Sequence, residues 1–505
     1  MTDLPSGWER VSVADIADVQ GGIQKQAKRR PVKNKYPFLR VANVGRGKLN
    51  LKDVHEIELF EGEIERFRLR PGDLLVVEGN GSPKEIGRAA MWHGEIGDCV
   101  HQNHLIRVRP TSAVLPKYLE LAWSSPDIVW QLRRTASSTS GLFTLSTSKI
   151  KLIQVSIPPR EEQQRIVDIL ESQLSRCGAA VSLLLGIMKR IDALRDRVME
   201  AASLGRLLEV NSESFAAPPA PAGVLDGDLP RLPNDWRWLR LGDIAEVVGG
   251  VTKDSKKQSD PNLPEVPYLR VANVQRARLN LSSISYIRVS AAKADQLMLR
   301  RGDVLLNEGG DRDKLGRGWI WEDQIPGCIH QNHVFRARLL DKILHPKLLA
   351  WHANGFGRTW FERNGKQSVN LASIGLSKIK MFPVPIPPPA LQEKLVAEAE
   401  RHLSILDDAE AAVRRALLQA DHLRRSLLSE ACSGRLTSQA SEDEPASESL
   451  YRAQVKRATK HDSKAGKIKK SSVVRRSTVP NTVVSSIDDV EPTIMKGTPV
   501  QETLL

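Results

Sequence analysis

One sequence unit occurs twice in this chain, at a separation of about 229 residues. The run Phe38-Leu-Arg-Val-Ala-Asn43-Val returns as Tyr268-Leu-Arg-Val-Ala-Asn273-Val, and His101-Gln-Asn-His104 returns as His330-Gln-Asn-His333. Shorter matches keep the same order; they are Trp8 and Trp236, Gly21-Gly22 and Gly249-Gly250, Gly72-Asp73 and Gly302-Asp303, and Glu78-Gly79 and Glu308-Gly309. The chain is therefore expected to fold as two copies of one domain, and its function must use two similar sites.

Each copy carries short β-like runs between Gly, Pro and Asn turn signals. Examples are Leu74-Leu-Val-Val77 and His104-Leu-Ile-Arg-Val108. Apolar and β-branched runs of this length, bounded by turn residues, are typical of strands in a mixed domain. We predict mixed α/β domains over residues 1–157 and 229–385, related as a pseudo-two-fold internal repeat.

A long helical pattern follows each domain. Apolar positions are separated by alternating steps of three and four; in the first helix they include Leu170, Leu174, Leu184 and Ile191, and in the second Leu395, Ala399, Leu406 and Val413. Such a heptad seam is typical of a coiled coil, and an unpaired helix would leave its apolar stripe in water. We predict spacer helices over 158–208 and 386–437 that pair in an antiparallel coiled coil.

Two segments lack this periodicity. Residues 209–228 are rich in Ser, Ala and Pro and are interpreted as a linker. Residues 438–505 contain blocks of both charges and few periodic apolar positions, a composition that predicts a disordered charged tail.

Composition excludes several classes of protein. The 505 residues contain no apolar run of 18 or more residues and no secretory signal pattern, so we expect a cytoplasmic protein without a membrane segment. The four cysteines show no C-x-x-C spacing, which favours reduced thiols. A formal charge of +14 favours a polyanionic partner, because Lys and Arg release counterions from phosphates.

The repeated Cys-x-His-Gln-Asn-His motif could be a structural turn, a metal site or a direct DNA contact. On a strand, Cys99 and His101 share a face whereas His104 points to the other, so three ligands would not converge without a turn. Because the motif is identical in both copies, we favour a structural role and predict no metal site. The run Glu78 to Gly87 lacks the Gly-Lys-Ser/Thr of a phosphate-binding loop, and neither copy contains a methylase or helicase motif, so we predict no catalytic residues.

The order domain, helix, domain, helix resembles the specificity (S) subunit of type I restriction-modification systems. The most specific local signature is Ile157-Pro-Pro-Arg-Glu-Glu-Gln163-Gln-Arg-Ile-Val167, at the start of the first helix. The second helix begins with Ile386-Pro-Pro-Pro-Ala-Leu-Gln392-Glu-Lys-Leu-Val396, in which Leu391 replaces the acidic residue of the family pattern. The resemblance covers residues 1 to about 437.

This resemblance implies a noncatalytic reader of double-stranded DNA. Each domain would be a target recognition domain that reads half of a bipartite, asymmetric site, and the helices would set the spacer between the halves. The implied partners are two methyltransferase (M) subunits and the restriction (R) subunits. S-adenosylmethionine, ATP and magnesium are expected on those partners, and no cofactor on this chain. The helices would also dock the methyltransferases, with candidate residues Gln163, Leu184, Ile191, Gln392, Leu406 and Leu417.

Base-reading residues should differ between the copies, because two domains that read different sequences need different side chains. Three pairs of loops diverge and are rich in Arg, Lys, Asn and Gln, side chains that can contact phosphates or base edges. The candidate DNA-binding residues are Lys25, Lys28, Arg29, Arg30, Lys33, Lys35, Lys84, Arg133 and Arg134 in the first copy, and Lys253, Lys256, Lys257, Arg312, Lys314, Arg363, Lys366, Gln367 and Asn370 in the second.

Two alternatives stay open at this point. One is a duplicated DNA-acting enzyme with an unrecognised active site. The other is a protein-only coiled-coil adaptor, which would explain the helices but not two basic domains with divergent polar loops.

Overall fold

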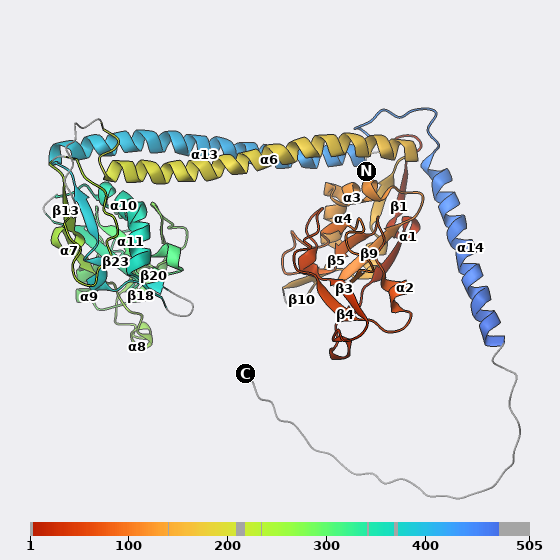
Figure 1. Cartoon of the computed structure of the whole chain (residues 1–505), viewed down its shortest axis with the longest axis horizontal. Helices are drawn as coiled ribbons and strands as arrows, with labels where there is room; N and C mark the ends of the chain where they lie inside the picture. The colour runs from red at the N-terminus through yellow and green to blue at the C-terminus, as the bar shows by residue number, and fades with distance from the viewer. Residues whose placement is uncertain are drawn as a thin grey trace, which may run out of the picture. The chain divides into compact units, whose positions relative to one another are not determined.

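The computed structural model describes residues 4–139, 141–208, 218–233, 235–340, 343–367 and 372–473 (Figure 1). The chain divides into two compact units: the first contains residues 1–173 and 425–505, and the second contains residues 174–424. Each long helix therefore contributes one part to each unit.

Within its described residues, the first unit contains four small β-sheets. The central one has the order β2-β9-β5-β7, formed by Ala17–Gly21, Leu105–Pro110, Leu74–Val77 and Ala89–Met91. The second is β4-β3-β8 (His55–Glu58, Lys35–Leu39, Val100–His101), the third is β10-β11-β6 (Ser137–Thr139, Leu142–Thr144, Gly79–Asn80), and β1 (Glu9–Ser12) pairs with β12 (Gln154–Ile157). Its short helices are α1 (Val13–Ile16), α2 (Glu63–Phe67), α3 (Pro116–Trp123), α4 (Pro126–Thr135) and α5 (Thr147–Lys151).

The second unit repeats these sheets with the same strand orders. They are β14-β23-β19-β21 (Ala245–Val248, Val334–Leu339, Val304–Asn307, Gly318–Ile320), β18-β15-β22 (Ser285–Arg288, Glu265–Leu269, Ile329–His330), β20-β25-β24 (Gly309–Gly310, Ala372–Ser373, Lys366–Gln367) and β13-β26 (Arg237–Arg240, Pro383–Ile386). A further hairpin joins β16 (Val274–Gln275) and β17 (Arg278–Leu279). The helices are α7 (Leu241–Ile244), α8 (Ser255–Gln258), α9 (Ala291–Leu297), α10 (Pro346–Asn354), α11 (Phe356–Asn364) and α12 (Leu376–Ile379). The prediction of two repeated mixed domains agrees with this architecture.

The structure explains why the repeat preserves two pairs of glycines. A Cβ atom on Gly22 would lie 2.2 Å from the carbonyl oxygen of His101, and one on Gly250 would lie 2.0 Å from that of His330, so only glycine allows this close backbone approach. Gly72 and Gly302 both have a φ of +91°, which favours glycine. Each precedes a buried aspartate: Asp73 binds Arg109 through both carboxylate oxygens, and Asp303 binds Arg338 in the same way.

The repeated Asn of the Leu-Arg-Val-Ala-Asn run also serves the fold. The Asn43 side chain accepts from the backbone N–H of Arg40 (2.8 Å) and donates to the carbonyls of Asn50 and Asp53 (both 2.8 Å). Asn273 makes the equivalent three bonds. Because all of these partners are backbone atoms, the motif fixes a turn without reference to neighbouring side chains.

The long helices α6 (Arg160–Ser203) and α13 (Pro389–Cys432) begin and end a few residues inside the predicted bounds. In the second unit, Met199 and Ala202 share one core cluster with Leu395 and Ala399. Arg195, the polar interruption of the first seam, donates to Asp407 (2.7 Å) and Glu410 (2.9 Å). Positions late in α6 thus meet positions early in α13, so the two segments run in opposite directions within this unit.

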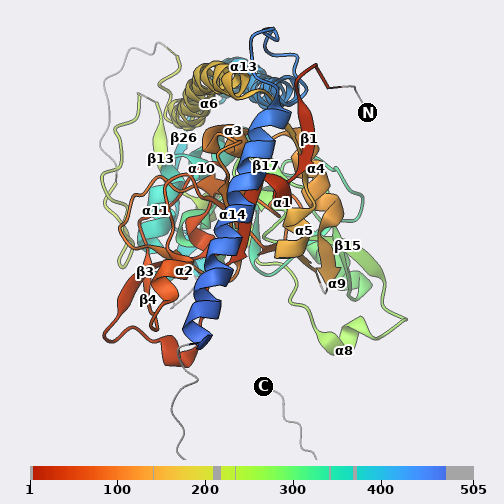
Figure 2. The ribbon, with the colours of Figure 1, turned by 90° about the vertical axis from the view of Figure 1, so that its right-hand side faces the viewer.

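The structure corrects the prediction that the whole of 438–505 is a disordered tail. A helix, α14, spans Ala446–Val473 and lies along the first unit (Figure 2). Ala446, Leu450 and Ala453 are buried on its inner face, at helical spacing. This short apolar stripe was not apparent from the sequence, because it lies next to the acidic run at 442–444 and among eight Lys and Arg residues. Residues 474–505 lie outside the described residues.

The last part of the predicted linker is likewise packed. Asp226 is buried and accepts hydrogen bonds from both Arg240 nitrogens (2.9 and 2.7 Å) and from the Trp360 indole (2.9 Å). Residues 218–228 therefore belong structurally to the second unit, whereas 209–217 lie outside the described residues.

Candidate nucleic-acid interface

The first candidate loop, residues 24–35, is held by an ion pair at its centre. Arg29, in a 3-10 turn over Ala27–Arg29, binds Glu63 through two hydrogen bonds of 2.7 Å and lies over the Phe60 ring, 4.6 Å from its centroid. The hydrogen bond from Arg29 lowers the pKa of Glu63 below its usual range. Arg29 was predicted to bind DNA, but the structure engages its guanidinium in supporting the loop.

A second carboxylate organises the far side of this loop. Glu58 accepts hydrogen bonds from the backbone N–H groups of Val32 (2.7 Å), Lys33 (3.1 Å) and Asn34 (2.9 Å), and these bonds lower its pKa. The remaining predicted residues of the loop are exposed; they are Lys25, Lys28, Arg30, Lys33 and Lys35. The loop is therefore a fixed frame that presents five positive charges to solvent.

The second unit holds its corresponding loop with different residues. Lys253, Lys256 and Lys257 are exposed on and before α8, whose first turn is capped by Asp254. Gln258 then exchanges two hydrogen bonds of 3.1 Å with the backbone of Arg288. In each unit this loop lies at the end opposite the long helices (Figures 1 and 2).

The other two candidate loops of the first unit meet in one small sheet. β6 begins the loop that holds Lys84, and β10 follows Arg133 and Arg134 at the end of α4; both strands pair with β11. Lys84, Arg133 and Arg134 are exposed, and Arg134 lies over the ring of Trp130, 5.1 Å from its centroid. Trp130 is itself 56% exposed, so an aromatic face stands beside these charges, a feature that the sequence analysis did not identify.

The equivalent sheet of the second unit brings the predicted loops into direct contact. Arg312 donates to the Gln367 side chain (3.4 Å), and both residues are exposed, as is Lys366. Lys314 forms an ion pair with Asp311. Arg363 is exposed, but its guanidinium is directed to Gly227, where a Cβ atom would lie 2.0 Å from Nη1. Asn370 lies outside the described residues.

The repeated His-Gln-Asn-His motif divides into a buried and an exposed half. His101 and His330 are fully buried, and burial lowers their pKa values to about 3 and about 4. Burial also raises the pKa of Cys99 and of Cys328 to about 12. The exposed His104 instead contacts Glu78 (3.0 Å), and His333 contacts Glu308 (2.6 Å). Within the described ranges, no three His, Cys, Asp or Glu side chains are placed to share a metal ion.

The two glutamines among the predicted docking residues are buried inside the units. Gln163 accepts from the Leu115 N–H (2.8 Å) and donates to the carbonyls of Ala113 (3.0 Å) and Pro158 (3.1 Å). Gln392 makes the same three bonds, to His345, Ile343 and Pro387. These buried side chains tie each long helix to its own domain, whereas the prediction placed them on a docking surface.

Except for Leu423, the exposed large apolar residues of the helices lie off the heptad seam. Of the predicted docking residues, Ile191 is buried and Leu184, Leu406 and Leu417 are half-buried. The exposed large apolar residues are instead Leu183, Leu185, Leu194, Ile405, Leu418 and Leu423 in the second unit and Ile169 in the first. The run Leu183-Leu184-Leu185 was a usable signal, because a seam can bury only one of three consecutive leucines.

None of the helices in the described part of the chain is both long and apolar enough to cross a membrane.

Comparison with known proteins gives consistent results over most of the chain. A family model described as the type I restriction modification DNA specificity domain matches residues 5–177. The StySPI specificity subunit of Salmonella potsdam, a type I restriction enzyme subunit, is 23% identical over 446 residues, which cover 86% of this chain and 90% of that protein. The EcoKI specificity subunit of Escherichia coli K12 is 30% identical over 177 residues, or 34% of this chain and 37% of its own length.

A solved structure from work on complex assembly and conformational transition of the type I R-M system has the same fold. The superposition has a TM-score of 0.63 at 17% sequence identity, and covers 86% of this chain and all of that chain.

Proposed function

Since this chain belongs to the family of type I restriction-modification specificity subunits, we propose that each of its two units reads one half of a bipartite, asymmetric DNA site. The observation that carries this proposal is the contrast between framework and loops. The two units share strand order, buried aspartate–arginine pairs and turn asparagines, yet their three pairs of candidate loops differ in sequence. Shared scaffold with divergent polar surface is the arrangement expected of two readers with different targets.

The loops offer the chemistry of both phosphate and base recognition. Lysines such as Lys25 and Lys256 suit phosphates, whereas Arg312, Gln367 and Arg134 can fork to guanine or adenine in the major groove. Because the small sheets hold two candidate loops together in each unit, a base-reading surface of several residues can form there.

The long helices are proposed to form an antiparallel coiled coil that fixes the unspecified spacer between the half-sites. Each helix has 44 residues, or about 66 Å at 1.5 Å per residue. Half-sites about one turn of B-DNA apart, roughly 34 Å, would face the protein on the same side of the duplex. The opposite directions of α6 and α13 in the second unit support this pairing.

We further propose that the exposed leucines on the helices dock two methyltransferase subunits, and that restriction subunits join that complex. Leu418 is 72% exposed and Leu183 is 65% exposed. Large apolar side chains grouped on a helix surface are typical of protein interfaces. The chain is noncatalytic by itself, so S-adenosylmethionine, ATP and magnesium are assigned to the partners, and the complex to the cytoplasm, where its DNA is.

The experiment is to coexpress this chain with its candidate methyltransferase subunit and to map methylated adenines across the genome by single-molecule sequencing. A new bipartite motif with a fixed gap is the expected result. Exchange of residues 24–35 for residues 253–264 should then alter only the half read by the first unit. An intact complex that adds no methylation at any motif would contradict the reader function.

A further inference from the structure

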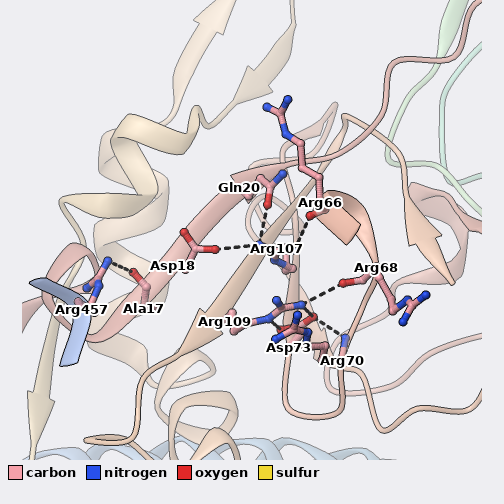
Figure 3. Close-up of polar contacts among 10 residues, drawn as sticks. All are labelled: Ala17, Asp18, Gln20, Arg66, Arg68, Arg70, Asp73, Arg107, Arg109 and Arg457. Carbon is pink, nitrogen blue, oxygen red and sulfur yellow. Dashed lines mark hydrogen bonds and ion pairs between the residues drawn. The ribbon is translucent and has the colours of Figure 1, made fainter. Parts of the chain in front are cut away.

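The central sheet of each unit carries two arginines that are built into the framework in the same way. Each arginine is paired with a carboxylate. The pairs are Arg107–Asp18 and Arg109–Asp73 in the first unit (Figure 3), and Arg336–Glu246 and Arg338–Asp303 in the second. A surface that both units build alike cannot distinguish two half-sites, so a reading residue must lie where the units share a backbone position but not a side chain.

Strand β4 and its counterpart β18 meet this condition at one position. In β4, Glu56 lies opposite Pro37 of the central strand β3, and in β18, Tyr286 lies opposite Pro267 of β15. Both strands are edge strands of sheets with the same strand order, and β4 lies at the end of its unit opposite the long helices (Figure 1). Glu56 and Tyr286 therefore occupy equivalent places, and both side chains are exposed.

The backbone at this position is held on both sides in each unit. Three residues earlier, the turn asparagine Asn43 donates to the carbonyl of Asp53 (2.8 Å), and Asn273 donates to that of Ser283 (2.9 Å). The residue that follows the position is a buried isoleucine in both strands. The framework thus fixes the place of the side chain without restricting its identity.

Glu56 is a carboxylate among positive charges. It lines a cavity of about 960 Å³ together with Lys25, Arg29 and Arg30 of the first candidate loop. Arg29 is paired with Glu63, whereas Glu56 has no hydrogen-bond or ion-pair partner among the described residues. Beside cations that suit phosphates, an unpaired carboxylate repels DNA unless it accepts a hydrogen bond from a base.

We propose that Glu56 is a base-reading residue of the first unit, and that its carboxylate accepts a hydrogen bond from the N4 amino group of a cytosine in the major groove. This inference rests on the proposed function, which brings a half-site to this unit. Cytosine presents only this donor in the major groove, whereas adenine also presents its N7 acceptor, which would face the carboxylate unfavourably. Tyr286, which is 59% exposed, gives the second unit a hydroxyl group and an aromatic face in the same place.

The test compares assembled methyltransferase complexes that contain the wild-type chain, Glu56→Ala or Glu56→Gln. The exchange of residues 24–35 identifies the half of the methylated motif that the first unit reads, and that half should contain a C·G pair. Competition among duplexes with each of the four base pairs at this position then measures the preference for cytosine. Glu56→Ala should reduce this preference by about 5- to 100-fold, and Glu56→Gln should move it towards adenine, whose N6 and N7 match an amide.

Two control variants separate base reading from general effects on binding. Lys25→Ala, in the same cavity, should weaken binding to all four duplexes alike and leave the motif unchanged. Tyr286→Ala should change one position of the other half of the motif and leave the preference for cytosine intact.

Three results would overturn the role of Glu56 while leaving the reader function intact. They are a first half-site without a C·G pair, an unchanged base preference in Glu56→Ala, and an equal rise in the affinity of Glu56→Ala for all four duplexes, which would make Glu56 only a repelling charge. A wild-type complex that assembles but methylates no motif would instead refute the proposed function, and this inference with it.

Discussion

Replacement of Gln163 by alanine separates a structural role from a docking role for this residue. The side chain is fully buried and makes three hydrogen bonds of 2.8 to 3.1 Å, all to backbone atoms. Each bond contributes about 1 kcal/mol, and a buried backbone group left without a partner costs about as much or more. Gln163→Ala should therefore destabilise the first unit by about 3 kcal/mol, equivalent to a change of roughly 140-fold in its unfolding equilibrium.

Urea unfolding, with hydrogen exchange as the readout, can assign this loss of stability to one unit. Protection in β5 and β9 should fall in Gln163→Ala, while protection in β19 and β23 is unchanged; Gln392→Ala should show the reverse pattern. Gln163→Glu provides a control of similar size that keeps the acceptor but replaces the amide donor with a group that, when ionised, cannot donate.

The opposite result would refute this reasoning. If Gln163→Ala unfolds like the wild-type protein but no longer copurifies with the methyltransferase, then the glutamine acts at the partner surface and the buried contacts contribute little.

Three further outcomes are expected. Leu418→Glu should release the methyltransferase in a pull-down without changing thermal stability, whereas Leu417→Glu, beside it but half-buried, should lower stability; equal effects would contradict the assignment of the docking face. Arg29→Ala and Glu63→Ala should weaken recognition by the first unit to a similar extent if Arg29 holds the loop, whereas a defect confined to Arg29→Ala in a binding assay would mean that Arg29 contacts DNA. Burial lowers the pKa of His330 and His352 to about 4, below the unfolded value of about 6.5, so the unfolded chain binds more protons than the folded chain as pH falls. Between pH 7.5 and 5.5 the second unit should therefore lose about 3 kcal/mol of unfolding free energy, and the first unit about 1.4 kcal/mol through His101. Urea unfolding at the two pH values measures both losses, and equal losses would count against these pKa values.

The repeat made the fold accessible from the sequence. Because Asn43 and Asn273 serve the same backbone turn, and Gly22 and Gly250 meet the same carbonyl, the matched residues marked framework positions without a structure. The 3-4 spacing likewise placed both long helices to within a few residues of their observed ends.

The partners of individual polar side chains could not be predicted in this way. Nothing near Arg29 in the sequence indicates Glu63, which is 34 residues away, and Gln163 meets Leu115 at a distance of 48 residues. Such pairs form only when the tertiary fold brings distant segments together. The heptad seam likewise identified residues through which the helices contact each other. It did not identify Leu418, which is exposed and lies one position away from the predicted Leu417. Helix α14 was missed because its buried stripe has only a few small or apolar residues beside dense charge.

The frame of loop 24–35 and its exposed charges are carried by different residues. Glu58 holds the loop through backbone N–H groups, which every residue except proline provides, and Arg29 supplies the only side chain of the loop that is paired with a carboxylate among the described residues. Substitutions at exposed positions such as Lys25, Lys28 or Arg30 should therefore change stability by no more than about 0.5 kcal/mol. A recognition loop of this design is evolvable: it can acquire a new target sequence one side chain at a time while the protein remains folded at every step.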